Sequence, residues 1–284
     1  MSQDFFQVPY HLFLGIEPGA SDPGEVELVL PFREDNSNPG GTLHGGLAVS
    51  LINSAARLAA QKALDLEDWA WAEPMSQEIL YLSPVQSETA RVRARIPRRG
   101  RGIAYAQVET YRESGEPAYL GLVSLRVPQK DPERQVDPAP ARRDWPAAPS
   151  DLAELFIGML TASPTYVGRL APEILSMDGG KSSARLAYRE ELSDSRGYLH
   201  PGAIGGLIDM VGATAAFTLI DYPMRASVTP ELHLNFFAPA GAEGVVALGE
   251  VTWRRDELSQ VEVRVYGGQS GALVANASMV YRIT

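Results

Sequence analysis

The sequence has no cysteine among its 284 residues and only four histidines. Without cysteine there can be no disulfide bond, thiolate nucleophile or cysteine-ligated metal. His11 and His233 have no partners at metal-ligand spacing, so we expect no metal site and no cofactor. The lack of disulfides fits a reducing compartment, and residues 1–15 lack the basic and then apolar pattern of a signal peptide. We therefore expect a cytoplasmic protein.

Positive charge is in the minority, because 25 Lys and Arg stand against 35 Asp and Glu, giving a formal net charge of −10. This balance disfavours nucleic acids and anionic membranes as partners. One apolar run, residues 202–220, approaches the length of a membrane span, but it carries Asp209 near its middle. A buried core helix explains the run better, so we expect no membrane partner.

The segment Leu199–Ile220 is helix-length and almost wholly apolar, with Asp209 as its one charged residue. A helix that is apolar on all sides is a buried helix. A buried carboxylate is costly unless its charge is compensated, so Asp209 is a candidate functional residue. The alternative is a structural acid that accepts hydrogen bonds from backbone N–H groups.

An earlier segment, Leu43–Leu64, repeats this pattern with a period of 156 residues. The repeat aligns three pairs of positions: His44 with His200, Gly46 with Gly202, and Asn53 with Asp209. Each segment follows a polar turn and precedes a run of strand-like segments. A period this long indicates two copies of one domain, and the chain length agrees with two domains.

The pattern predicts the same plan in both halves: one long helix followed by an antiparallel meander. The first half has an extended segment at 24–32, a helix at 44–64 and strands at 75–85, 89–97, 102–112 and 118–128. The second has an amphipathic segment at 151–160, a helix at 200–220 and strands at 173–177, 181–190, 226–240, 245–255, 259–268 and 273–283. Residues 128–150 are rich in proline and charge, which predicts a linker between domains at 1–127 and 151–284.

The first repeat resembles the signature of the hotdog-fold acyl-CoA thioesterases, in particular the phenylacetate-pathway (PaaI-like) subfamily. Asn38, Gly41, His44, Gly45 and Gly46 match it, but Asn53 stands at the acid position. In the second repeat Asp209 matches the acid, Gly197 and His200 match, and Asp194 and Pro201 depart from the pattern. The resemblance implies an α+β fold, a tandem (double) hotdog in which a sheet wraps each long apolar helix. It also implies a CoA thioester as substrate.

Helix geometry constrains how such a site could form. Gly46 and Asp209 belong to different helices, and within one helix the glycine and acid positions are roughly 10 Å apart. The acid must therefore come from the partner helix, lying antiparallel. We predict one composite site with Asp209 as general base or nucleophile and the Gly46 N–H as oxyanion donor. Asn38 donates to the carbonyl or orients the loop, and His44 braces the turn.

The pairing of Gly202 with Asn53 lacks a carboxylate and is predicted to be silent. Further substrate-binding candidates are Gly45, Asn53, His200, Gly202, Arg99 and Arg101. The two arginines belong to a basic hairpin that, in the resembled family, meets CoA phosphates. On sequence alone the hairpin is an exposed turn, and the glycines of the second helix also suit close helix packing.

The favoured function is hydrolysis of an acyl-CoA or aryl-CoA thioester to a free acid and CoA. One alternative is a non-catalytic acyl-CoA binding module. The other is a hotdog enoyl-CoA hydratase, which pairs an Asp with a His a few residues later. No His follows Asp209 before His233, which weakens the second alternative. We also expect the double-hotdog unit to form a homo-oligomer.

Overall fold

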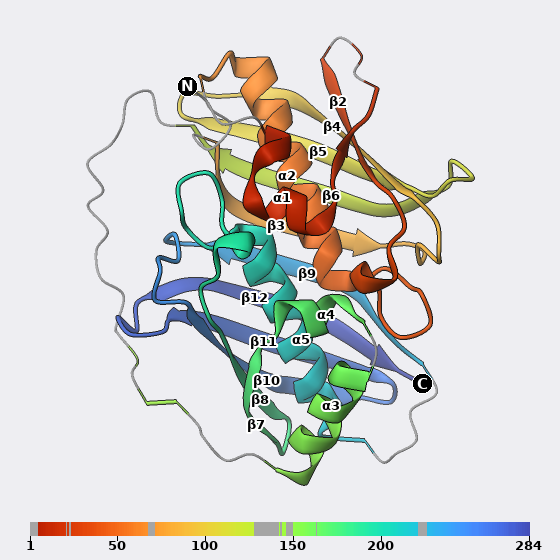
Figure 1. Ribbon diagram of the computed structural model, residues 1–284, viewed down its shortest axis with the longest axis vertical. Coiled ribbons are helices and arrows are strands. Elements are labelled where there is room, and N and C mark those ends of the chain that lie inside the picture. Colours follow the sequence, from red (N-terminus) through yellow and green to blue (C-terminus); the bar gives the residue numbers. More distant parts are fainter. Residues whose placement is uncertain are drawn as a thin grey trace.

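The structure is a computed structural model that describes residues 5–20, 22, 24–67, 72–127, 142, 144–145, 150–162, 164–220 and 226–284. Twelve strands form one sheet in the order β1-β2-β4-β5-β6-β3-β9-β12-β11-β10-β8-β7. The first six strands in this order come from the first half of the chain and the last six from the second (Figure 1). The sequence-based prediction of a tandem hotdog is confirmed.

The first half carries one long helix and six strands. Its elements are η1 (Phe5–Gln7), α1 (Pro9–Leu14), β1 (Glu17–Pro18), β2 (Glu25–Leu30), η2 (Glu34–Asn36), α2 (Gly45–Leu64), β3 (Glu73–Tyr81), β4 (Ala90–Arg99), β5 (Ile103–Tyr111) and β6 (Pro117–Arg126). In the tight turns after β4 and β5, Gly102 and Gly115 have φ values of 77° and 85°, which favour glycine. These turns join β4 to β5 and β5 to β6 as antiparallel neighbours, as the predicted meander requires.

The second half repeats the plan with one additional helix before it. Its elements are α3 (Asp151–Ala162), α4 (Tyr166–Leu170), β7 (Glu173–Asp178), β8 (Lys181–Leu186), η4 (Glu190–Leu192), α5 (Pro201–Phe217), β9 (Ser227–Phe236), β10 (Val245–Arg255), β11 (Leu258–Gly267) and β12 (Leu273–Ile283). Helix α5 ends at Phe217, three residues before the end predicted from its apolar run. The short helices α1 and α4 were not predicted.

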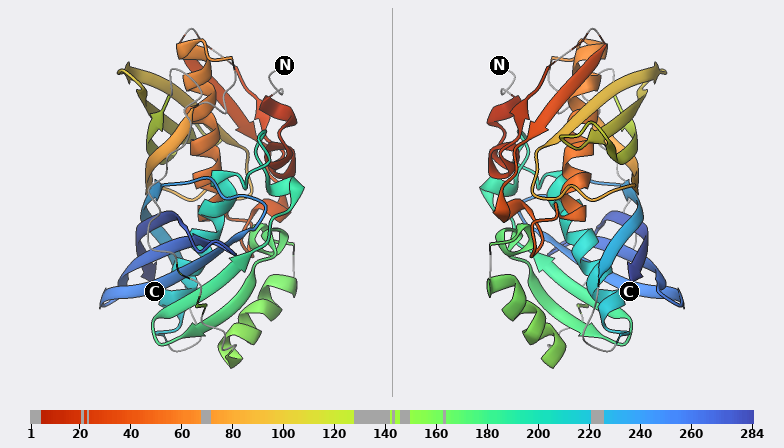
Figure 2. Two further views of the ribbon diagram at one scale, coloured as in Figure 1. Left: turned by 90° about the vertical axis from the view of Figure 1, so that its left-hand side faces the viewer. Right: turned by 90° about the vertical axis from the view of Figure 1, so that its right-hand side faces the viewer.

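Strands β3 and β9 join the halves into a continuous antiparallel sheet. Their register runs from Ser76 opposite Asn235 to Leu80 opposite Glu231. Two side views show the sheet curving around the two long helices, with the short helices on the other side (Figure 2). Alternate residues of the strands face the helices, and the core extends through both halves.

Helices α2 and α5 run antiparallel and overlap through their amino-terminal turns (Figure 1). Glycine permits this close approach. A Cβ on Gly46 would lie 2.6 Å from the Cα of Gly206, and one on Gly202 would lie 2.8 Å from the Cα of Ser50. The packing role predicted for the second-helix glycines is therefore confirmed, and the two amino ends face each other's helix.

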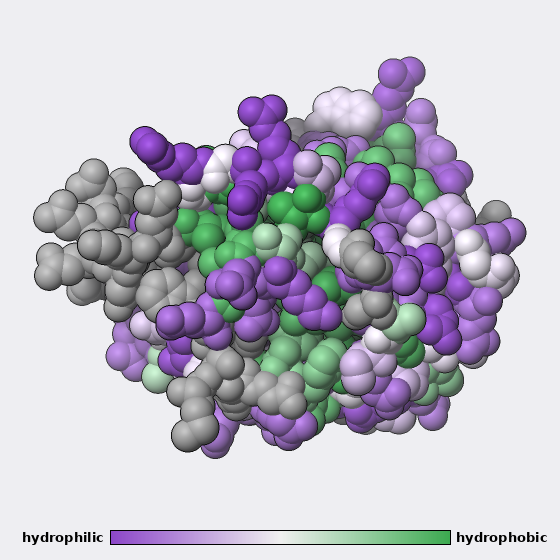
Figure 3. All heavy atoms as spheres, turned by 90° about the horizontal axis from the view of Figure 1, so that it is seen from above, coloured by the Kyte–Doolittle hydropathy of each residue, from purple (hydrophilic) through white to green (hydrophobic). Residues whose placement is uncertain are grey.

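Seen from above, apolar residues gather near the centre of one face and hydrophilic residues surround them (Figure 3). Within the described part of the chain, no helix is long and apolar enough to cross a membrane. Most of the predicted linker, 128–150, lies outside the described residues, so the domain boundary stays a prediction.

Candidate active site

The amino end of α2 is organised by His44, its N-cap residue. The His44 Nδ1 accepts a hydrogen bond from the Gly46 N–H at 3.0 Å. Because Nδ1 is an acceptor, the neutral ring carries its proton on Nε2. Burial lowers the pKa of His44, and the nearby Asp209 partly opposes this shift. A neutral, capping His44 agrees with the predicted bracing role.

Asp209 reaches this helix end from α5, as the crossing argument predicted. The Gly46 N–H, which donates to His44, also donates to Asp209 Oδ2 at 2.8 Å. This carboxylate oxygen lies 3.4 Å from the His44 Nδ1. The Asp209 side chain is 7% exposed. A nearly buried carboxylate therefore sits at the positive end of the α2 dipole, where negative charge is stabilised.

Thr229 on β9 completes the surroundings of the acid. Its hydroxyl donates to Asp209 Oδ1 at 2.9 Å, so each carboxylate oxygen accepts a hydrogen bond. Sequence reasoning missed Thr229, because a threonine in a strand is ordinary and nothing in its neighbourhood marks it. Together these bonds hold the carboxylate in one orientation, which is what a positioned base or nucleophile requires.

Gly45, the first residue of α2, lies directly against the acid. A Cβ at this position would be 2.9 Å from Asp209 Oδ2. Among the described residues, the Gly45 N–H has no hydrogen-bond acceptor, as expected in a helix's first turn. Its carbonyl accepts from the Tyr81 hydroxyl at 2.9 Å. The Gly46 N–H predicted as oxyanion donor is thus engaged with Asp209, whereas the Gly45 N–H beside it has no partner in the part of the chain that the structure describes.

The equivalent end of α5 lacks these reactive groups. His200 caps the helix as His44 does, and its Nδ1 accepts from the Gly202 N–H at 3.0 Å. Pro201 occupies the position of Gly45 and therefore has no N–H. Asn53, at the acid position, donates to the Gln77 side chain at 3.3 Å, and its Oδ1 has no partner among the described residues.

Two tyrosines, also 156 residues apart, connect the two helix ends. The hydroxyls of Tyr10 on α1 and Tyr166 on α4 are 2.7 Å apart. Tyr10 stacks on His200 with ring centroids 4.7 Å apart, and Tyr166 lies 5.1 Å from the His44 ring. The short helices α1 and α4 thus cover the capping histidines, and no periodic pattern signalled them.

Asn38 lies in the turn before α2, and Asp194 lies in the matching turn before α5. The two turns share their backbone hydrogen bonds, from the Asn38 N–H to the Thr42 carbonyl and from the Asp194 N–H to the Tyr198 carbonyl, both 2.7 Å long. The Asp194 carboxylate also accepts from the Arg196 and Tyr198 N–H groups. Asn38 is partly exposed in its turn, and its predicted role toward a carbonyl stays a prediction.

Arg99 and Arg101 lie at the other end of the first half. The chain that leads into β4 runs beside the α2 amino end, because the Leu43 N–H donates to the Val85 carbonyl at 2.9 Å. Arg99 is the last residue of β4, roughly 30 Å along a strand of this length. The structure therefore does not bring the arginines to Gly46 within one chain, and their contact with CoA phosphates stays a prediction.

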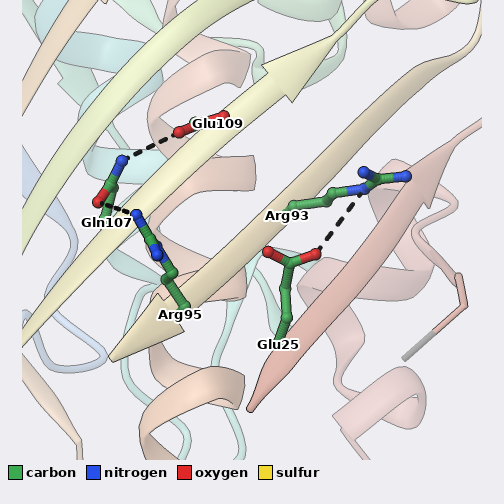
Figure 4. A pocket seen from close by; sticks show the side chains of 5 residues that line it. All are labelled: Glu25, Arg93, Arg95, Gln107 and Glu109. Atoms are coloured by element: carbon green, nitrogen blue, oxygen red, sulfur yellow. Dashed lines mark hydrogen bonds and ion pairs between the residues drawn. The ribbon is translucent and has the colours of Figure 1, made fainter. Parts of the chain in front are cut away.

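A charged cavity of about 230 Å³ lies on the outer face of the strands before this hairpin. Figure 4 shows its lining residues, which are Glu25, Arg93, Arg95, Gln107 and Glu109. Their polar groups are already engaged, since Arg93 pairs with Glu27 at 2.8 Å and more distantly with Glu25 at 4.0 Å, and Arg95 donates to Gln107 at 3.0 Å. Across the described ranges, no three His, Cys, Asp or Glu side chains gather as a metal site would require.

Two segments of the chain match thioesterase families. Residues 33–126 match the family described as acyl-CoA thioesterase N-terminal domain, and residues 196–273 match the thioesterase superfamily. A provisionally named esterase of Saccharolobus solfataricus is 30% identical over 105 residues, covering 37% of this chain and 73% of that protein. Human acyl-coenzyme A thioesterase 13 is 30% identical over 88 residues, covering 31% of this chain and 61% of that protein.

A further relative from Halobacterium salinarum is 33% identical, and the match spans 27% of this chain and 52% of that protein. Among solved structures, an acyl-CoA thioesterase II from Mycobacterium marinum aligns with a TM-score of 0.65 at 11% identity, covering 99% of this chain and 98% of that one. A hotdog-fold protein from Alicyclobacillus acidocaldarius aligns with a TM-score of 0.63 at 12% identity, covering 100% and 99%. At these identities the structural likeness shows the fold.

The double hotdog fold and the thioesterase matches in both halves place this protein in the class of hotdog-fold thioester hydrolases. The chain belongs to the thioesterase superfamily, with two thioesterase domains in tandem.

Proposed function

We propose that this protein is an acyl-CoA thioesterase with one composite active site, to which both halves contribute. The observation that carries the proposal is the Asp209 carboxylate of α5 at the amino end of α2. Each domain alone has half of the required groups, because α2 supplies the N–H donors and α5 supplies the acid. The family matches over both halves support the thioester as substrate class.

In the proposed reaction the thioester carbonyl oxygen binds at the free Gly45 N–H, in place of the Gly46 N–H assigned from sequence. Negative charge that develops on this oxygen is stabilised by the N–H and by the α2 dipole. Asp209 acts either as base toward a water molecule or as nucleophile. Asp209 is oriented by the Gly46 N–H and by the Thr229 hydroxyl.

Both routes end with the same balance of atoms. The carbonyl carbon gains an oxygen from water, the C–S bond breaks, and the departing thiolate takes up a proton. In the base route Asp209 receives this proton from the attacking water and returns it to the thiolate. In the nucleophile route an Asp209 anhydride forms first, and water then hydrolyses it.

The α5 amino end is proposed to be silent for two independent reasons. Asn53 cannot serve as a base, and Pro201 has no N–H with which to donate the hydrogen bond that we propose for Gly45 in the first site. This pair of losses also favours catalysis at the first site over a protein that binds acyl-CoA at both ends equally.

The test is release of CoA thiol from short, medium, long-chain and aryl CoA thioesters. We expect turnover by wild type, a loss of at least about hundredfold in Asp209→Asn, and retention in Asn53→Asp. Asn53→Asp in the Asp209→Asn background should not restore activity, because Pro201 still lacks an N–H. Binding of a thioester without any turnover would instead favour the non-catalytic binding module.

A further inference from the structure

A second cavity, of about 320 Å³, lies at the amino end of α5. Both halves build it. The first half contributes the start of β3 and the end of β6, and the second contributes the turn before α5 and the chain that follows β9. Its apolar lining includes Met75, Ile204, Phe236 and Phe237, and its charged lining is Glu73, Arg126, Asp194 and Arg196.

The position of this cavity is equivalent to the approach to the proposed active site. The period of 156 residues relates its turn, 194–199, to the turn 38–43 before α2. Pro201 in its lining corresponds to Gly45, against which Asp209 lies. The chain therefore has a ligand-sized space at the helix end that lacks the acid and the N–H donor.

The apolar part of the lining is unusually accessible. Phe237 is 49% exposed and Met75 is 36% exposed, although both line a concave site. Ile204 forms a buried wall, at 2% exposure. Such a surface loses free energy in water and gains it when an apolar group covers it.

The charged side chains of the cavity differ in how far they are paired within the protein and in how far they are exposed to a ligand. Asp194 is almost fully buried; its Oδ1 accepts from two backbone N–H groups, and its Oδ2 ion-pairs with the Arg196 Nε at 3.7 Å. Glu73 ion-pairs with Arg196 at 3.1 Å and with Arg126 at 3.8 Å, so one carboxylate is divided between two guanidinium groups. The side chains of Arg126 and Arg196 are 44% and 34% exposed. The two carboxylates and two guanidinium groups balance in formal charge, but the guanidinium groups are the more exposed, because the Glu73 and Asp194 side chains are only 18% and 3% exposed.

We propose that this cavity binds an amphipathic anion without hydrolysing it. Its acyl or aryl group would lie against Met75, Phe236 and Phe237, and its anionic end would lie at Arg126 and Arg196. Two sources share this chemistry, the CoA thioester and the free acid released from it. The choice of these two rests on the proposed function, whereas the cavity and its charges do not.

The experiment is calorimetric titration of the full chain with S-octyl-CoA, a thioether that cannot be hydrolysed. Wild type should bind two equivalents. Phe237→Ala and Arg126→Ala should each weaken one class of sites by roughly tenfold and leave the other class unchanged. The matched control is Trp253→Ala, because Trp253 is 52% exposed and lies outside the cavity lining. It should keep both classes.

Competition with octanoate then separates the two sources. The question in wild type is whether octanoate competes only at the class of sites that Phe237→Ala and Arg126→Ala weaken. Displacement of S-octyl-CoA from that class alone would identify the free acid as the ligand of the cavity, and no displacement would identify the thioester. A single class of sites in wild type, or two unchanged classes in both variants, would overturn the proposal. Thiol release by wild type is scored separately. Turnover together with one bound equivalent of S-octyl-CoA would contradict the second binding site but not the proposed hydrolysis. Two bound equivalents without turnover would contradict the proposed hydrolysis but not the second binding site.

Discussion

The Gly46 N–H of α2 donates a 2.8 Å hydrogen bond to Asp209 Oδ2 of α5, across 163 residues of sequence. This bond fixes the acid of one domain to the helix end of the other. The two residues lie in different repeats, so neither domain can build the arrangement alone. The consequences for activity and stability depend on the side chains that surround this bond.

Thr229→Val should lower kcat by roughly tenfold to a hundredfold, because Asp209 Oδ1 would lose its hydrogen-bond donor in a buried setting. Thr229→Ser keeps a hydroxyl and should restore kcat. An unchanged kcat in Thr229→Val would show that this hydroxyl does not orient the acid.

Gly45→Ala should reduce kcat by roughly tenfold to a hundredfold while leaving the chain folded. The new Cβ would lie 2.9 Å from Asp209 Oδ2 and would displace the carboxylate. Gly158→Ala is the matched control, because a Cβ there meets nothing within 4 Å. Steady-state kinetics and thermal unfolding of both variants make the comparison. Equal activities would mean that the acid tolerates displacement and that its present position is not required.

Tyr10 and Tyr166 should stabilise each other through their buried hydroxyls, which are 2.7 Å apart. Burial raises the pKa of Tyr166 to about 12, so both hydroxyls stay protonated at neutral pH. Tyr10→Phe and Tyr166→Phe should each cost about 1 kcal/mol of unfolding free energy. A double-mutant cycle by urea unfolding should give a non-additive result, whereas full additivity would deny the bond any net contribution.

Stability should fall as the pH is lowered from about 6.5 toward 5, because buried histidines must be protonated on unfolding. Burial lowers the pKa of His11 from 6.5 to about 3, and the pKa values of His44 and His200 are lowered as well, mainly by burial. The stabilisation is fully present above the unfolded pKa and is lost below it. Each proton taken up contributes about 1.4 kcal/mol per pH unit.

His11→Gln should flatten this dependence between pH 5 and 6.5 in urea unfolding. His233→Gln is the control, because His233 lies on the exposed side of β9. The interpretation would be wrong if both variants kept the slope of wild type.

The sequence by itself determined the duplication, the two buried helices and the partnership of Asp209 with the α2 amino end. Apolar periodicity indicates which segments are helices and strands. Gly202 and Asp209 are seven residues apart on one helix, and the rise per residue places them too far apart to contact the same substrate carbonyl. These are local properties of the chain, so they can be predicted from its composition and residue spacing. The hairpins between β4, β5 and β6 belong to the same group, because their glycines adopt a backbone conformation that side chains disfavour.

Only the tertiary structure decided which groups surround the acid. Thr229 lies twenty residues beyond Asp209 on a strand, and α1 and α4 are too short to produce a periodic signal. The same applies to the engaged Gly46 N–H, the free Gly45 N–H and the open cavity beside Pro201. Each depends on the register of β3 against β9 and on the crossing of α2 over α5, where a shift of one residue changes every contact. Long-range packing fixes that register, and no local pattern encodes it.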